Sequence, residues 1–149
     1  MITLTDQPFA PGELLTAFSL GRSETGAIAT FTGLARAEAG ATQVLELQAY
    51  PGFTERQIGK IADQARERFG LHDLAVLHRV GKIAPGEAIV FVATAASHRR
   101  AAFEACDFLM DYLKSRAPFW KKETGPGGDR WIEPKLQDHA DIARWETTT

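Results

Sequence analysis

The sequence predicts a single-domain α+β fold, and three observations lead to that prediction. The chain has 149 residues, enough to bury roughly 70% of its unfolded surface without a disulfide or a metal. Segments with a helical spacing of apolar residues alternate with short β-rich segments bounded by glycine or proline. No repeat, charge block or low-complexity linker divides the chain, so we expect one domain over residues 1–149.

The first third of the chain is predicted to hold a strand, a short helix and a pair of strands. Ile2–Asp6 fits a short strand, and Pro11 suits the first turn of a helix whose apolar face has Leu14, Leu15 and Phe18. Residues 26–33 are β-rich and bounded by glycines, and the apolar residues at 44–47 indicate a second strand. We expect these two strands to form a hairpin-like pair across the loop at 36–42.

The middle of the chain is predicted to hold a helix followed by two buried strands. Thr54–Gln57 matches a capping box, apolar positions then follow a helical stripe, and Gly70 is placed to terminate the helix. Leu74–Val80 and Ala88–Ala95 are typical of buried strands because apolar residues dominate both. The glycines and the proline at 81–87 predict the turn that joins them.

The last third is predicted to hold a long helix, two short strands and a final helix. Ser97 is expected to cap the long helix, whose apolar face continues to Lys114 or to the residue after it. Residues 119–123 and 129–133 are expected to form strands on either side of a glycine-rich loop, and the tail at 136–145 a helix.

Composition and charge exclude several classes of function. A net charge of −2 argues against a general binder of polyanions, so any anion site has to be local. The single cysteine, Cys106, permits no internal disulfide. The first residues lack the basic and apolar regions of a signal peptide, and no apolar run is long enough to span a bilayer. We therefore expect a cytoplasmic protein that does not contact a membrane.

The most informative segment is residues 97–123, where two cationic clusters bracket the predicted long helix. His98-Arg99-Arg100 opens the helix, where free amide groups and the positive end of the helix dipole favour an anion. The second cluster lies at and beyond the helix end, and repulsion within it favours deprotonation of a lysine; it contains Lys114, Arg116, Lys121 and Lys122. With Phe119 and Trp120 added, the composition points to an anionic, flat, aromatic ligand. The alternative is a solvent-exposed basic surface with both aromatic residues in the core, and the residue chemistry leaves the two readings open.

Several motifs occur in a recognisable order along the chain. They include His78-Arg79-Val80-Gly81, Pro85-Gly86-Glu87, Ser97-His98-Arg99, Asp111-Tyr112-Leu113-Lys114 and Ala117-Pro118-Phe119-Trp120-Lys121-Lys122-Glu123. In this order, from about Gly26 to Glu133, the chain resembles the MoaE family, the large, catalytic subunit of molybdopterin synthase. The resemblance implies an α/β hammerhead-like fold with a mainly antiparallel sheet and flanking helices.

The resemblance implies a sulfurtransferase of molybdenum cofactor biosynthesis. Two sulfurs are placed on cyclic pyranopterin monophosphate to make the dithiolene of molybdopterin. The sulfur arrives as the C-terminal thiocarboxylate of a small ubiquitin-like (MoaD-like) carrier subunit, whose Gly-Gly tail enters the pocket. Such a chain needs no reactive cysteine, which fits Cys106 as a small core residue, and we expect no cofactor, metal or ATP site. Since this chain ends in Glu146-Thr147-Thr148-Thr149, we do not expect it to be the carrier.

The resemblance also implies roles for individual residues. Lys121 and Lys114 match the catalytic lysines, with Lys121 the better candidate for direct acid-base or covalent chemistry. Substrate contacts are implied for both lysines and for Leu34, Ala35, Arg36, His98, Arg99, Lys122 and Glu123, and pocket-lining positions for Phe31 and Met110. Family members often carry lysine where this chain has Leu34, so we expect contacts at Leu34 and Ala35 to be made by the backbone. Lys135 stands where the family has arginine, which weakens bidentate phosphate binding there.

The length of the predicted helix argues that the two cationic clusters do not share a pocket within one chain. Arg99 and Lys114 are 15 helical steps apart, which is roughly 22 Å at 1.5 Å per residue. We therefore expect a symmetric homodimer in which His98 and Arg99 of one subunit complete the site built on Lys114 and Lys121 of the other. The resemblance implies that two carrier subunits flank this dimer in a heterotetramer.

Two functions of other classes are alternatives to sulfur transfer. Residues 114–135 interleave basic residues with Phe119, Trp120 and Trp131, as in modules that bind single-stranded nucleic acid. Acidic residues fall in the same interval and the net charge is negative, so we expect no nucleic-acid partner. The other alternative is a non-catalytic scaffold, which binds a ubiquitin-like partner without turnover.

Overall fold

The computed structural model describes residues 1–36, 44–117, 119–125, 128–132 and 136–146. Within them, helices and strands follow one another in the mixed order that the sequence predicts. The elements are β1 (Ile2–Thr5), α1 (Pro11–Ser19), β2 (Ala27–Leu34), β3 (Val44–Ala49), α2 (Phe53–Phe69), β4 (Asp73–Arg79), β5 (Gly81–Ile83), β6 (Ala88–Ala96), α3 (Arg99–Ser115), β7 (Phe119–Gly125), β8 (Gly128–Ile132) and α4 (Leu136–Glu146).

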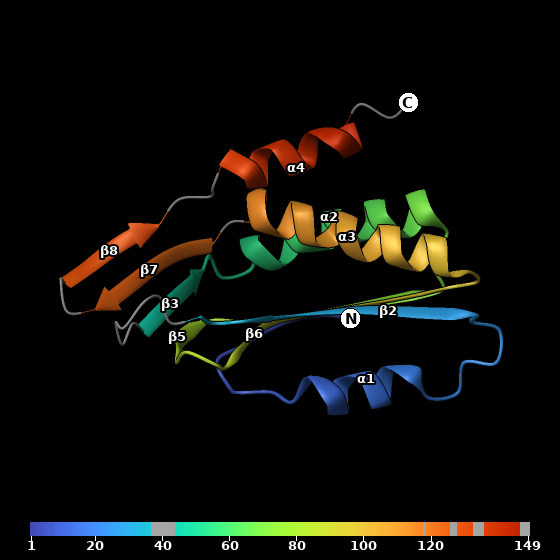
Figure 1. Cartoon of the computed structure of the whole chain (residues 1–149), viewed down its shortest axis with the longest axis horizontal. Helices are drawn as coiled ribbons and strands as arrows, with labels where there is room; N and C mark the ends of the chain where they lie inside the picture. Colours follow the sequence, from blue (N-terminus) through green and yellow to red (C-terminus); the bar gives the residue numbers. More distant parts are fainter. Residues whose placement is uncertain (37–43, 118, 126–127, 133–135, 147–149) are drawn as a thin grey trace.

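The larger sheet, sheet A, has the strand order β1-β4-β6-β2, and helices cover both of its faces. Figure 1 shows α2 and α3 on one face and α1 on the other. Because side chains alternate along a strand, Leu74 and Val76 of β4 pack with the α2 and α3 core, while Ala75 and Leu77 pack with α1. Two-sided burial explains why β4 and β6 read as continuous apolar runs in the sequence.

The smaller sheet, sheet B, has the strand order β5-β3-β7-β8 and lies at one end of sheet A (Figure 1). The predicted hairpin between residues 26–33 and 44–47 is therefore wrong: β2 pairs with β6 in sheet A, whereas β3 pairs with β5 and β7 in sheet B. A local sequence pattern marks a strand but does not choose its partner, which depends on distant residues. The predicted strands at 119–123 and 129–133 do pair with each other, as β7 and β8.

Helix α2 begins and ends at glycines. The predicted capping box is wrong, because the helix starts at Phe53 after Gly52, which has a φ of 77° and provides no side-chain cap. Thr54 is instead fully buried, and its Oγ1 accepts a hydrogen bond from the Tyr50 backbone N–H at 2.9 Å. The end is as predicted, since Gly70 adopts the left-handed conformation.

Helix α3 begins at Arg99, one residue later than it would begin if Ser97 were its N-cap. His98 occupies the N-cap position and makes no capping hydrogen bond through its side chain. The Ser97 hydroxyl instead lies 3.0 Å from Nε2 of His72. The predicted cap is therefore corrected, while the predicted helix end at residue 114 or 115 is confirmed by the last helical residue, Ser115.

Helix α4 packs on α3, as Figure 1 shows, through a cluster of polar contacts around one buried carboxylate. Asp111 accepts hydrogen bonds from Nε and Nη2 of Arg144 and from Nε1 of Trp145. The Trp145 ring packs edge-on against Phe69 and Phe108. This helix confirms the element predicted at 136–145. Among the residues that the structure describes, no helix is both long and apolar enough to cross a membrane.

Candidate active site

Most of the predicted site residues lie at the end of sheet A where sheet B begins. Strand β2 runs from Ala27, which is paired with Ala96, to Leu34, which is paired with Ala88. Helix α3 starts just after Ala96 and runs back along the sheet in the direction of β2, so Lys114 is brought toward the end where Leu34 lies. Figure 1 shows this end of α3 next to β7.

His78 lies where the two sheets meet at this end. Its ring stacks on the ring of Phe119, the first residue of β7, with centroids 4.2 Å apart and planes 22° apart. Its Nδ1 lies 2.8 Å from the Arg79 carbonyl, which can only accept, so Nδ1 carries the proton. Burial, with a smaller contribution from the positive charge of Lys114, lowers the pKa of His78 to about 4. His78 is thus neutral at pH 7. The sequence analysis did not predict a role for His78, although its apolar neighbours on the strand were a signal for its burial.

Lys121 and Lys122 point to opposite faces of sheet B, because neighbouring residues on a strand alternate. Lys121 is paired with Leu47, which is buried, and shares its face with Phe119. Lys122 is paired with Glu46 on the other face. The structure therefore does not bring the two lysines together, although the sequence places both among the substrate contacts. Glu123 follows in register with Leu45.

The aromatic residue Trp120 lies on the same face of sheet B as Lys122, which we call the outer face. The opposite face, with Lys121 and Phe119, is the inner face. It is 50% exposed, and its ring lies 5.9 Å from the ring of Tyr50. Of the two aromatic residues in the cationic segment, Phe119 is the one that faces the inner side with Lys121.

The end of β2 contributes the remaining predicted contacts. Leu34 and Arg36 are exposed, whereas Ala35 between them is buried. The Ala35 N–H donates to the Glu87 carbonyl at 2.8 Å, and the Ala35 carbonyl accepts from Gly86 N–H at 2.7 Å. The N–H and the carbonyl of Ala35 are thus both hydrogen-bonded within the chain, and the expected backbone contacts with substrate at Leu34 and Ala35 stay a prediction.

The two predicted pocket-lining residues flank the same end. Phe31 is 40% exposed, and its ring lies over Gly33, where a Cβ would come within 3.2 Å of Cε1 of Phe31 and 2.9 Å of a Val90 methyl group. A side chain at residue 33 would therefore crowd both Phe31 and Val90. Met110 is half-buried on α3 and packs against the main core.

His98 and Arg99 lie at the opposite end of α3, as the helix length predicts. Both are exposed, and the first turn of the helix contains no acidic residue. The backbone before them is held tightly: a Cβ on Gly26 would lie 2.0 Å from the Ser97 carbonyl oxygen. Within one chain, the structure therefore separates this pair from Lys114, Lys121 and Arg36.

Cys106 is a core residue, as predicted. Its side chain is 7% exposed, and burial, with a smaller contribution from Asp107, raises the pKa of its thiol to about 12. At neutral pH the thiol is protonated and inaccessible, so it does not serve as a nucleophile. The described residues contain no group of three or more His, Cys, Asp or Glu side chains that are placed to hold a metal ion.

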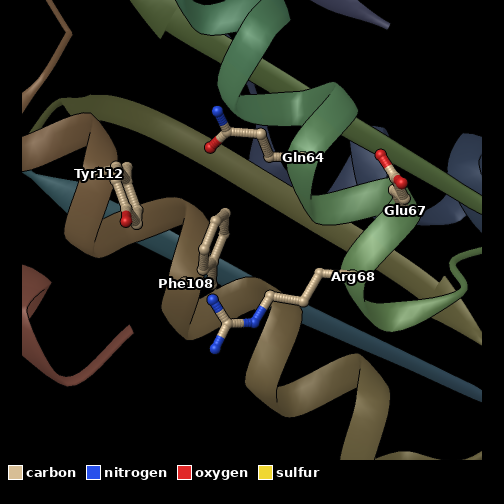
Figure 2. Close-up of a pocket in the computed structure, with 5 residues that line it drawn as sticks. All are labelled: Gln64, Glu67, Arg68, Phe108 and Tyr112. Atoms are coloured by element: carbon tan, nitrogen blue, oxygen red, sulfur yellow. The ribbon is translucent and has the colours of Figure 1, made fainter. Parts of the chain in front are cut away.

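A hollow of about 370 Å³ lies elsewhere, between α2 and α3. Figure 2 shows the residues that line it: Gln64, Glu67, Arg68, Phe108 and Tyr112. Arg68 also donates to the Trp145 carbonyl at 2.9 Å, which ties the hollow to the packing of α4. None of the predicted site residues lines this hollow, so it is distinct from the cationic end of the fold.

Comparison with known proteins connects this geometry to one family. A profile described as the MoaE protein matches residues 4–116. The chain is 68% identical to the molybdopterin synthase catalytic subunit of Caulobacter vibrioides, over 98% of this chain and 97% of that one. It is 52% identical to the subunit of the same name from Cereibacter sphaeroides, over 93% of this chain and 95% of that one. The solved structure of the MoaE molybdopterin biosynthesis protein of Burkholderia ambifaria superimposes with a TM-score of 0.84 at 43% identity, covering 99% of both chains.

These matches span nearly the whole chain, and they agree with the mixed fold of two mostly antiparallel sheets described above. The chain belongs to the MoaE family, the catalytic subunits of molybdopterin synthase.

Proposed function

We propose that this chain transfers sulfur from the C-terminal thiocarboxylate of a small ubiquitin-like carrier to cyclic pyranopterin monophosphate, forming the dithiolene of molybdopterin. The relatives' shared name, catalytic subunit of molybdopterin synthase, supports the enzyme class and implies a second kind of subunit. One observation carries the rest. Lysines and Arg36 gather at the junction of the sheets, while the single thiol is buried and protonated. The sulfur therefore has to come from outside the chain.

The cationic groups at the junction suit an anionic substrate and an anionic sulfur donor. Arg36 binds phosphate or pterin oxygens through charge-assisted hydrogen bonds. The carrier tail enters as an extended segment, and its sulfur forms the new carbon–sulfur bond on the substrate. Lys114, within electrostatic range of His78, stabilises the negative charge that develops on the substrate.

Lys121 is the residue best placed for direct chemistry, since it shares the inner face of sheet B with Phe119. In each transfer, the acyl–sulfur bond to the carrier breaks and the carrier leaves as a carboxylate after water adds to its acyl group. The substrate oxygen that sulfur replaces departs with a proton that Lys121 donates. A second carrier delivers the second sulfur. The alternative role for Lys121 is transient capture of the carrier acyl group as an amide, which intact-protein mass spectrometry detects as a covalent adduct.

The site is completed by a second copy of the chain. His98 and Arg99 lie about a helix length from Lys114, so we assign them to the site of the partner subunit in a symmetric dimer, with one carrier bound to each catalytic subunit.

The experiment is co-purification with the native carrier, followed by mass detection of the product. Supplied with thiocarboxylated carrier and the cyclic precursor, the complex is expected to form a product that contains two sulfurs. Stable carrier binding with no dithiolene product contradicts the proposal and favours the scaffold.

A further inference from the structure

An ion pair near the site, between a buried arginine and a half-buried glutamate, has no part in the chemistry described so far. Arg79, the last residue of β4, is 4% exposed. Its Nη1 donates to Glu87 Oε2 at 3.2 Å, and its Nη2 donates to the Lys82 carbonyl at 3.0 Å. The other carboxylate oxygen of Glu87 accepts from the Ala84 N–H at 2.7 Å. These contacts hold the segment between β4 and β6 at three points.

The same segment fixes the backbone that leads to Arg36. The Glu87 carbonyl accepts from the Ala35 N–H, and the Gly86 N–H donates to the Ala35 carbonyl. Both hydrogen bonds are short, at 2.8 and 2.7 Å, and Ala35 is buried. Arg36 follows directly and is exposed. The path of the chain at Arg36 therefore depends on where residues 86 and 87 lie.

Stability alone does not explain why an arginine is buried in this pair. Nε of Arg79 is buried and has no hydrogen-bond partner in the part of the chain that the structure describes. Burying a guanidinium costs free energy, and a donor left unpaired adds to that cost. The Ala84 amide and the Arg79 guanidinium hold the pKa of the Glu87 carboxyl below its usual range, so the charge on Glu87 persists at neutral pH.

We propose that Arg79 and Glu87 are positioning residues of the active site, which act through Gly86, Glu87 and Ala35 to set the place of Arg36. Neither side chain contacts the substrate. The inference rests on the proposed function only in taking Arg36 as a substrate contact.

The test is a double-mutant cycle in the complex with thiocarboxylated carrier, with the cyclic precursor varied. R36A is expected to raise KM by about 10- to 100-fold, because it removes a charge-assisted hydrogen bond. E87A is expected to raise KM by about 3- to 10-fold when Arg36 is present, and by nothing further in the R36A background. E87Q keeps one acceptor oxygen, which serves either Arg79 or the Ala84 N–H but not both, and is expected to restore part of the loss.

Asp63→Ala is the control, since Asp63 forms an exposed ion pair with Arg66 on α2. It is expected to leave KM unchanged. If E87A does not stay folded at the assay temperature, E87Q takes its place in the cycle with a rise of about 2-fold that is likewise lost without Arg36.

Three results overturn the inference. One is an equal rise in KM on changing Glu87 with and without Arg36. Another is a fall in kcat alone, which indicates a smaller folded fraction. If R36A leaves KM unchanged while the wild-type complex forms product, the role of Arg36 fails, and the inference with it, but the sulfur-transfer function stands. If the wild-type complex forms no product, the proposed function itself fails.

Discussion

The two ends of α3 carry similar charges in different surroundings. At the C-terminal end, the charge of Lys114 reaches the stacked rings of His78 and Phe119, and two sheets meet there. At the N-terminal end, His98 and Arg99 are exposed, and no acidic residue in the first turn of the helix balances them. At the first end, the His78 ring is buried enough to stay neutral at pH 7. In the proposed function, the second end binds an anion presented from outside the chain.

The proposed function assigns both ends of α3 to one substrate, and the distance between them decides how they can contact it. One small ligand does not bridge roughly 22 Å, so neither end forms a whole site within one chain. A two-fold axis that brings the N-terminal end of one subunit to the C-terminal end of the other makes two equal sites. Each prediction below separates what the two ends contribute.

The largest expected effect is at the C-terminal end. Lys121→Ala is expected to lower kcat by about 1,000-fold or more, because it removes the proton donor. Lys60→Ala is the matched control, since Lys60 is an exposed lysine on α2 outside the predicted site, and its effect is expected to stay within about 3-fold. The measurement is the rate of dithiolene formation with thiocarboxylated carrier. Retention of most of the rate by K121A contradicts the role given to Lys121.

His78 makes the stability of the C-terminal end depend on pH. Its pKa is about 4 in the folded chain and 6.5 ordinarily, so between these values the unfolded chain binds more protons than the folded one. Stability is therefore expected to fall as the pH drops from 6.5 to 4, by about 3 kcal/mol at most.

The variant His78→Phe isolates this contribution, because it keeps an aromatic ring against Phe119 but does not titrate. Urea unfolding at several pH values is expected to show a smaller loss of stability for H78F than for the wild type across this window. Parallel curves for the two proteins show that His78 is not buried as a neutral ring.

The N-terminal end is expected to act on binding more than on chemistry. Arg99→Ala is expected to raise KM for the cyclic precursor by about 10- to 50-fold with a smaller change in kcat, because it removes a charge-assisted contact with the substrate. Arg100→Ala serves as the control, because Arg100 is also exposed but is the next residue along the helix and so points in a different direction from Arg99. Its expected change in KM is less than about 2-fold. Steady-state kinetics distinguish the two, and equal effects of R99A and R100A indicate general electrostatic attraction.

The smallest effect is expected between the two ends, at Cys106. Because the pKa of this thiol is about 12, native protein at pH 8 is expected to react with a thiol reagent far more slowly than unfolded protein. Cys106→Ala is expected to keep the wild-type rate and to cost about 1 kcal/mol of stability. Rapid modification together with loss of activity points to a catalytic thiol.

Local patterns predicted the elements of the fold, and distant contacts decided the rest. The helix that ends at Gly70 and the pair of strands around residues 126–127 depend on neighbours in sequence, and both were predicted. The partner of β3 was not, because β3 pairs with β5 and β7 across long stretches of chain. Strand β5 was missed altogether, since three residues inside a turn carry no period of their own.

The site was predictable to the extent that it follows from periodicity. Helical rise alone separates Arg99 from Lys114, and strand alternation alone places Lys121 and Lys122 on opposite faces, although only the first consequence was drawn from the sequence. The hydrogen bond from the Ala35 N–H was not predictable, because its acceptor, the Glu87 carbonyl, belongs to another segment, which Arg79 holds in place. The roles of the individual residues rest on resemblance and on the experiments above.

The most direct test of the shared site uses heterodimers purified with two different tags. A dimer of one K121A chain and one R99A chain has one intact site and one doubly altered site if residues are shared across subunits, so about half of the wild-type activity per dimer is expected. A dimer of one wild-type chain and one K121A/R99A chain then has two damaged sites, and with the cyclic precursor held well below its wild-type KM it is expected to be nearly inactive. The reverse pattern, an inactive first dimer and a half-active second, contradicts a site shared between subunits.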